Sequence, residues 1–99
     1  MCNWHGKSTD ELCDALLSLK NKEECYSFLE DICTIKEILE MSQRLTVAKL
    51  LDSGMSYSKI SQETGVSTAT ISRISRCIGY GNGGYKLVID RLKEVESND

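Results

Sequence analysis

The chain has 99 residues, no proline, a formal net charge of -3 and a thin aromatic set of one Trp, four Tyr and one Phe. A domain of this length buries about two thirds of its unfolded surface, and the absence of proline and the small number of aromatic residues favour an all-α class. The apolar stretches are far shorter than the roughly 18 residues of a membrane span, and no basic and then apolar segment opens the chain, so we exclude membrane and secretory classes and expect a cytoplasmic protein.

Polar caps followed three residues later by Glu predict where the first helices begin, because this pattern satisfies unpaired amides in the first turn. Three pairs fit: Ser8 with Glu11, Asn21 with Glu24, and Thr34 with Glu37. The first two helices have apolar residues at helical spacing on one face: Leu12, Leu16 and Leu19, then Cys25, Phe28, Leu29 and Ile32.

The third predicted helix is long, since apolar residues keep helical spacing from Ile35 to Leu51, and a break near residues 41–43 is left open. Ser53 and Gly54 end it, because glycine adopts the left-handed conformation that closes helices. We interpret residues 8–53 as a helical dimerisation region. Their charged faces are interpreted as solvated surface rather than catalytic groups.

Residues 56–78 have the pattern of a helix-turn-helix. Gly65 separates two short helical segments and permits a sharp turn, and Ser67 is placed to cap the second one. The side chains that two crossed helices bring into contact are apolar: Ile60, Val66, Ile71 and Ile74. The sequence therefore predicts a motif with a buried inner side.

The outward side of the second helix is small and polar, so a DNA major groove admits it. Hydroxyls and a methyl group suit base edges or a thymine methyl, an arginine bonds guanine or phosphate, and an exposed helix start attracts the backbone. The DNA-binding residues predicted in this way are Ser56, Tyr57, Lys59, Ser67, Thr68, Ala69, Thr70, Ser72, Arg73 and Arg76.

The distribution of charge supports double-stranded DNA as the partner of this segment. Residues 1–40 carry four Lys against nine acids, residues 41–80 carry five cations against two acids, and residues 81–99 carry three against four. Only the middle segment suits phosphate. Two alternatives stay open: a coincidental pair of helices, or a helix-turn-helix that binds only proteins, which the low pI of about 5.1 favours.

The helix-turn-helix is followed by a Gly-rich loop at residues 79–84 and by a last helix with Val88, Leu92 and Val95. Glycines can cradle phosphate, but the spacing matches neither a Walker loop nor a dinucleotide fingerprint, so we interpret the loop as a hinge or turn. We see no repeat or linker that would separate a second domain, and residues 1–99 are taken as one domain.

Five cysteines at irregular spacing, without a C-x-x-C pair, are predicted to be mostly small buried hydrophobic residues rather than disulfides. Cys2 and His5 are too few ligands, on a terminal segment, to indicate a metal site. With a single histidine and no spacing typical of a nucleophile with its base, the chain is not expected to be an enzyme or to hold a cofactor.

Four segments together resemble the Trp repressor-like YerC/YecD family: residues 40–45 (EMSQRL), 64–73 (TGVSTATISR), 79–85 (GYGNGGY) and 16–33. The resemblance covers nearly the whole chain. It implies the Trp repressor fold, an intertwined helical homodimer with two reading heads, which are the helix-turn-helix units of the two copies. A two-fold dimer binds a roughly palindromic operator with half-sites about 34 Å apart.

The resemblance also bears on a small-molecule effector. In the Trp repressor two arginines sandwich the tryptophan indole, and Arg44 and Arg73 match them, the first only if one residue is deleted near Gly54. A structural role for Arg44 is the open alternative. Where the repressor has a glycine and a serine in the pocket, this chain has Ile74 and Cys77. A branched side chain fills such a pocket and the loss of a hydroxyl removes a polar contact, so we expect a DNA-binding regulator that does not respond to tryptophan.

Overall fold

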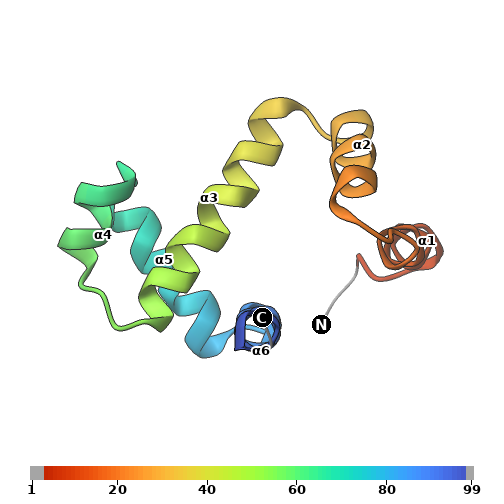
Figure 1. Ribbon diagram of the computed structural model, residues 1–99. Coiled ribbons are helices and arrows are strands. Elements are labelled where there is room, and N and C mark those ends of the chain that lie inside the picture. The colour runs from red at the N-terminus through yellow and green to blue at the C-terminus, as the bar shows by residue number, and fades with distance from the viewer. Residues whose placement is uncertain (1–3, 98–99) are drawn as a thin grey trace. The chain divides into compact units, whose positions relative to one another are not determined.

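The computed structural model describes residues 4–97, and every regular element in that range is a helix (Figure 1). This confirms the all-α class. The six helices are α1 (Lys7–Leu17), α2 (Lys22–Ile32), α3 (Ile35–Asp52), α4 (Tyr57–Thr64), α5 (Thr68–Tyr80) and α6 (Gly84–Ser97). No helix in residues 4–97 is both long enough and apolar enough to span a membrane.

The chain divides into two compact units, residues 1–38 and residues 39–99. The first contains α1, α2 and the start of α3, and the second contains the rest of α3 with α4, α5 and α6. All buried side chains found in the described range belong to the second unit.

Local hydrogen bonds set where the helices of the first unit begin. The Asn21 side chain accepts the Glu24 amide at 2.9 Å, as predicted, whereas the Glu24 carboxylate accepts the Lys20 amide rather than that of Asn21. The predicted cap at Ser8 is wrong. Helix α1 already begins at Lys7, because the Thr9 hydroxyl accepts the Gly6 amide at 2.8 Å and places Ser8 inside the first turn.

The third predicted cap is confirmed in full at the start of α3. The Thr34 hydroxyl accepts the Glu37 amide at 3.1 Å, and the Glu37 carboxylate accepts the Thr34 amide at 2.8 Å. These hydrogen bonds, the backbone one first, lower the pKa of Glu37. The α3 helix is therefore closed at its N-terminus by its own side chains.

Helix α3 runs through residues 41–43 without a break, as one helix of 18 residues. It ends where Gly54 adopts a φ of 92°. The Gly54 amide donates to the Leu51 carbonyl at 3.0 Å, and the Met55 amide donates to the Leu50 carbonyl at 3.2 Å. This is a Schellman closure, and it turns the chain sharply into α4.

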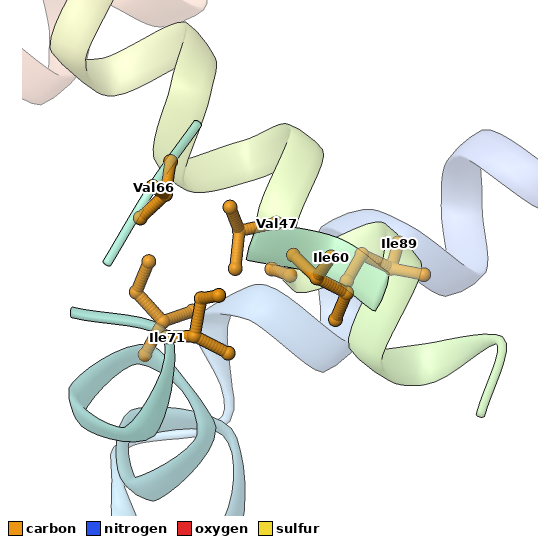
Figure 2. Close-up of a cluster of buried hydrophobic side chains, with 7 residues drawn as sticks. Val47, Ile60, Val66, Ile71 and Ile89 are labelled. Atoms are coloured by element: carbon orange, nitrogen blue, oxygen red, sulfur yellow. The ribbon is translucent and has the colours of Figure 1, made fainter. Parts of the chain in front are cut away.

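The core of the second unit brings α3, α4, α5 and α6 together. Val47 and Ala48 of α3 are completely buried, and the side chain of Val47 lies among those of Ile60, Val66 and Ile71 (Figure 2). Ile89 of α6, only 2% exposed, joins the same cluster. This core holds α4 and α5 against the C-terminal half of α3.

Two further expectations are wrong: the end of the second helix of the helix-turn-helix and the burial of the cysteines. Gly79 and Tyr80 belong to α5, because Ile78 packs against the core and carries the helix beyond the expected end, so that residues 81–83 alone connect α5 to α6. The cysteines of the described range are not buried either: Cys25 and Cys33 are half-buried, and Cys13 and Cys77 are exposed. Cys2 lies outside the described residues.

Candidate nucleic-acid interface

Two serine caps and one glycine shape the α4–α5 unit. The Ser56 hydroxyl accepts the Lys59 amide at 3.3 Å, and the Ser67 hydroxyl accepts the Thr70 amide at 3.2 Å. Between them Gly65 takes a φ of 77° and donates its amide to the Ser61 carbonyl at 2.8 Å. The left-handed glycine ends α4 abruptly, and α5 begins three residues later.

The inner side of this unit is buried as the sequence predicts. Ile60 and Ile71 are fully buried, Ile74 is 5% exposed and Val66 is 7% exposed. All four belong to the core cluster with α3. Burial of one side fixes which side of α5 faces outward, because residues on a helix repeat every 3.6 positions.

The predicted DNA-binding residues lie at or beside that outward side. Eight of the ten are exposed: Ser56, Tyr57, Lys59, Ser67, Thr68, Ala69, Arg73 and Arg76. Thr70 and Ser72 are half-buried, and the hydroxyl of Thr70 accepts a hydrogen bond from that of Ser67 at 3.1 Å. Thr70 therefore supports the start of α5 as well as flanking its exposed ridge.

The electrostatic character of this surface is positive. Residues 54–80 contain the cations Lys59, Arg73 and Arg76 and a single acid, Glu63. The ion pairs found in the described part of the chain involve Arg44, Lys86 and Lys93, and none involves the three cations of the α4–α5 unit. Their charges are therefore available to an anionic partner.

Two neighbouring hollows flank the C-terminal half of α5. The larger, about 550 Å³, is lined by Leu45, Cys77, Gly81, Asn82, Gly84, Tyr85 and Val88. The smaller, about 280 Å³, is lined by Arg73, Arg76, Cys77, Tyr80 and Gly81. Sequence reasoning missed Tyr80 because it was assigned to the Gly-rich loop, although its spacing of four residues from Arg76 was a usable signal.

Neither hollow is lined by both of the candidate ligand arginines, Arg44 and Arg73. Arg44 is exposed on α3, where its guanidinium lies 3.9 Å from the Glu40 carboxylate, and it lines neither hollow. Arg73 lines the smaller one. The side chain of Ile74 is part of the core, and Cys77 stands in the wall shared by both hollows.

A metal site has no support in the described residues, where no three His, Cys, Asp or Glu side chains gather closely enough to bind an ion. His5 is exposed and its ring packs edge-on against Trp4, with centroids 3.9 Å apart. The outward surface of the α4–α5 unit is built from hydroxyls, a methyl group and cations.

The family model for the Trp repressor protein matches residues 7–93. The chain belongs to the Trp repressor family. It is 54% identical over 92 residues to the uncharacterized protein YerC of Bacillus subtilis, and the aligned region spans 93% of this chain and 88% of YerC.

Solved structures of the Trp repressor family show the same fold. The crystal structure of a TrpR-like protein from Eubacterium eligens matches with a TM-score of 0.85 and 50% identity, covering 89% of this chain and 91% of that one. A second crystal structure, of a Trp repressor-type protein from Staphylococcus aureus, also has a TM-score of 0.85 and 50% identity, covering 90% and 89%. The Trp repressor-like fold of the single chain, predicted from the sequence, is confirmed.

Proposed function

We propose that this protein is a sequence-specific, DNA-binding transcriptional regulator that acts as a homodimer in the cytoplasm and does not respond to tryptophan. The observation that carries the proposal is the two-sided character of α5. Its inner side, with Ile71 and Ile74, is locked into the core, while its outer side presents hydroxyls, a methyl group and two unpaired arginines. Membership of a repressor family supports the same conclusion.

Each exposed group on this surface has a role that its chemistry suits. Thr68, Ala69 and Arg73, near the start of α5, face base edges in the major groove, where each good contact discriminates by about 1–3 kcal/mol. Lys59 and Tyr57, at the start of α4, face the phosphate backbone and fix the register of the helix. Arg76, further along α5, also faces the backbone, and Ser56, Ser67, Thr70 and Ser72 complete the surface.

The proposed homodimer rests on apolar side chains that a single chain leaves uncovered. Helices α1 and α2 bury no residue, although both are amphipathic. Leu16 is 45% exposed and Ile32 is 52% exposed, and α3 adds Ile35 at 72% and Leu39 at 62%. A second copy covers such faces and brings a second reading head for a palindromic operator with half-sites about 34 Å apart.

The experiment that tests this function is selection of bound fragments from the source genome, followed by titration of salt. We expect one sequence to be bound at least about 1,000-fold more tightly than random duplex, and the affinity for both to fall steeply as salt rises. Arg73→Ala should weaken binding to the selected sequence about 10-fold to 100-fold while leaving the oligomeric state unchanged.

The matched control is Arg91→Ala, which removes another exposed arginine, on α6 and outside the α4–α5 unit. Unchanged affinity in Arg73→Ala would count against the assignment of the reading helix. A chain that binds neither the selected fragments nor random duplex, but retains a protein partner, would instead support the alternative of a protein-interaction module, which the net charge of -3 favours.

A further inference from the structure

The outward ridge of α5 continues beyond the residues that the proposed function uses. Ala69, Arg73, Arg76 and Tyr80 follow one another at spacings of four, three and four residues, so they form one line along the helix, opposite the buried Ile71. The side chain of Tyr80 is 92% exposed. An aromatic ring so fully in solvent, at the end of a cationic ridge, contributes nothing to the core of this chain.

The local structure fixes Tyr80 as the last residue of the helix. The amide of Gly81 donates to the Cys77 carbonyl at 2.9 Å, and a Cβ atom at position 81 would lie 2.2 Å from that carbonyl oxygen. Only glycine tolerates this approach. Because Gly81 turns the chain away at this point, a hollow of about 280 Å³ remains beside Arg73, Arg76 and Tyr80.

The length of α5 decides which part of DNA this hollow meets. From Thr68 to Tyr80 the helix rises about 18 Å, at roughly 1.5 Å per residue. The major groove is only about 12 Å wide and about 8.5 Å deep. A recognition helix contacts base edges with its N-terminal residues. If α5 enters the groove with that end first, its last turn lies beyond the groove, at the level of the sugar-phosphate backbone.

The lining of the hollow suits a phosphate. The guanidiniums of Arg73 and Arg76 and the hydroxyl of Tyr80 are hydrogen-bond donors, and no acidic side chain lines the hollow. We propose that this hollow is a backbone-phosphate site in which Tyr80 and Arg76 hold one phosphate of bound DNA, beyond the bases that the start of α5 reads. The inference rests on the proposed function and adds Tyr80 to it.

The test compares full-length Tyr80→Phe and Arg76→Gln with the unchanged chain, using fluorescence anisotropy. The probes are the genomic sequence selected above and a random duplex of about 30 base pairs, roughly three helical turns. Loss of the Tyr80 hydroxyl should weaken binding to both probes by about threefold to tenfold, leaving their ratio unchanged. Because the proposed dimer carries Arg76 twice, Arg76→Gln should reduce the slope of log affinity against log salt by about two, one for each copy.

The control is Tyr26→Phe, the same change on an exposed tyrosine of α2, which should bind both probes like the unchanged chain. If Tyr80→Phe also binds both probes unchanged, the phosphate site is wrong while the regulator stands. If it loses affinity for the selected sequence alone, Tyr80 reads a base and the phosphate assignment is overturned. An unchanged chain that binds neither probe overturns the proposed function and this inference with it.

Discussion

Asp52 connects the end of α3 to α6 through two lysines. Its carboxylate lies 2.5 Å from the Lys93 ammonium and 3.5 Å from that of Lys86, which also lies 3.4 Å from Asp90. The hydrogen bond from Lys93, followed by the charge of Lys86, lowers the pKa of Asp52 against the opposing effect of partial burial. Because Asp52 is the last residue of α3 before the turn into α4, these contacts anchor α6 beside the base of the helix-turn-helix.

The lowered pKa of Asp52 predicts a loss of stability in acid. A carboxylate whose pKa is depressed by folding stabilises the native state above its unfolded pKa, about 3.9, and this contribution is lost as the pH falls through the folded pKa. We expect Asp52→Asn to lower the urea midpoint at neutral pH and to flatten its decline below about pH 4. Asp31→Asn, at an exposed position on α2, is the control and should keep the original pH profile.

Ile74 argues against tryptophan as an effector. The side chain is 5% exposed and belongs to the core cluster, in the position where the Trp repressor has a glycine. A ligand that needs this space would have to displace a packed side chain, and Cys77 offers only a weak donor in place of a hydroxyl. Calorimetry with free L-tryptophan should therefore show no binding, whereas a micromolar Kd would contradict the assignment.

At the scale of elements, two glycines near the end of α5 make opposite demands. Gly79 is helical and a Cβ atom there meets nothing within 4 Å, so Gly79→Ala should stabilise the protein by about 0.5–1 kcal/mol. Gly81→Ala places a methyl group against the Cys77 carbonyl and should destabilise it by about 1–3 kcal/mol. Urea denaturation measures both. Equal midpoints for the two variants would show that the turn after α5 is not required.

The elements that the sequence predicted well are those set by local contacts. The Thr34 cap and the turns at Gly54 and Gly65 depend on neighbours within a few residues, so their residue types reveal them. The end of α5 was placed too early because the packing of Ile78 against the core, a contact distant in sequence, overrides the low helix propensity of Gly79. For the same reason Tyr80 was assigned to the loop and was not predicted as a residue of the candidate site.

Cysteine burial failed as a prediction for a related reason. A thiol in a sequence shows that a side chain is small and apolar, but not which surface covers it. Cys13 and Cys77 are exposed in the single chain, whereas the isoleucines of the helix-turn-helix were placed correctly because they belong to a complete repeating pattern. Prediction thus succeeded where both partners of a contact lie in one motif.

At the scale of the whole molecule, the first unit is the part that most needs a partner. Burial of apolar surface is the main source of stability, at about 25 cal/mol per Å², and α1 and α2 bury no residue of their own. Exposed apolar side chains are also numerous on α6, where Leu87 is 50% and Val95 is 61% exposed. Since the proposed dimer covers such faces, we expect the Tm of the protein to rise with protein concentration.

A charge placed on the apolar face of α2 should separate the two copies. Ile32 shares that face with Phe28 and Leu29, whereas Ser27 lies on the opposite side of the same helix. Ile32→Glu should shift the chain from dimer toward monomer in sedimentation equilibrium and lower its Tm, because a buried carboxylate without a partner costs several kcal/mol, on the order of the energy that the interface supplies. Ser27→Glu adds the same charge to the same helix and should remain dimeric, with only a small decrease in Tm from repulsion by Glu23 and Asp31, one turn away on either side. A monomeric unchanged chain, or equal behaviour of the two variants, would show that this face is not the dimer interface, and the two reading heads would then need another means of being joined.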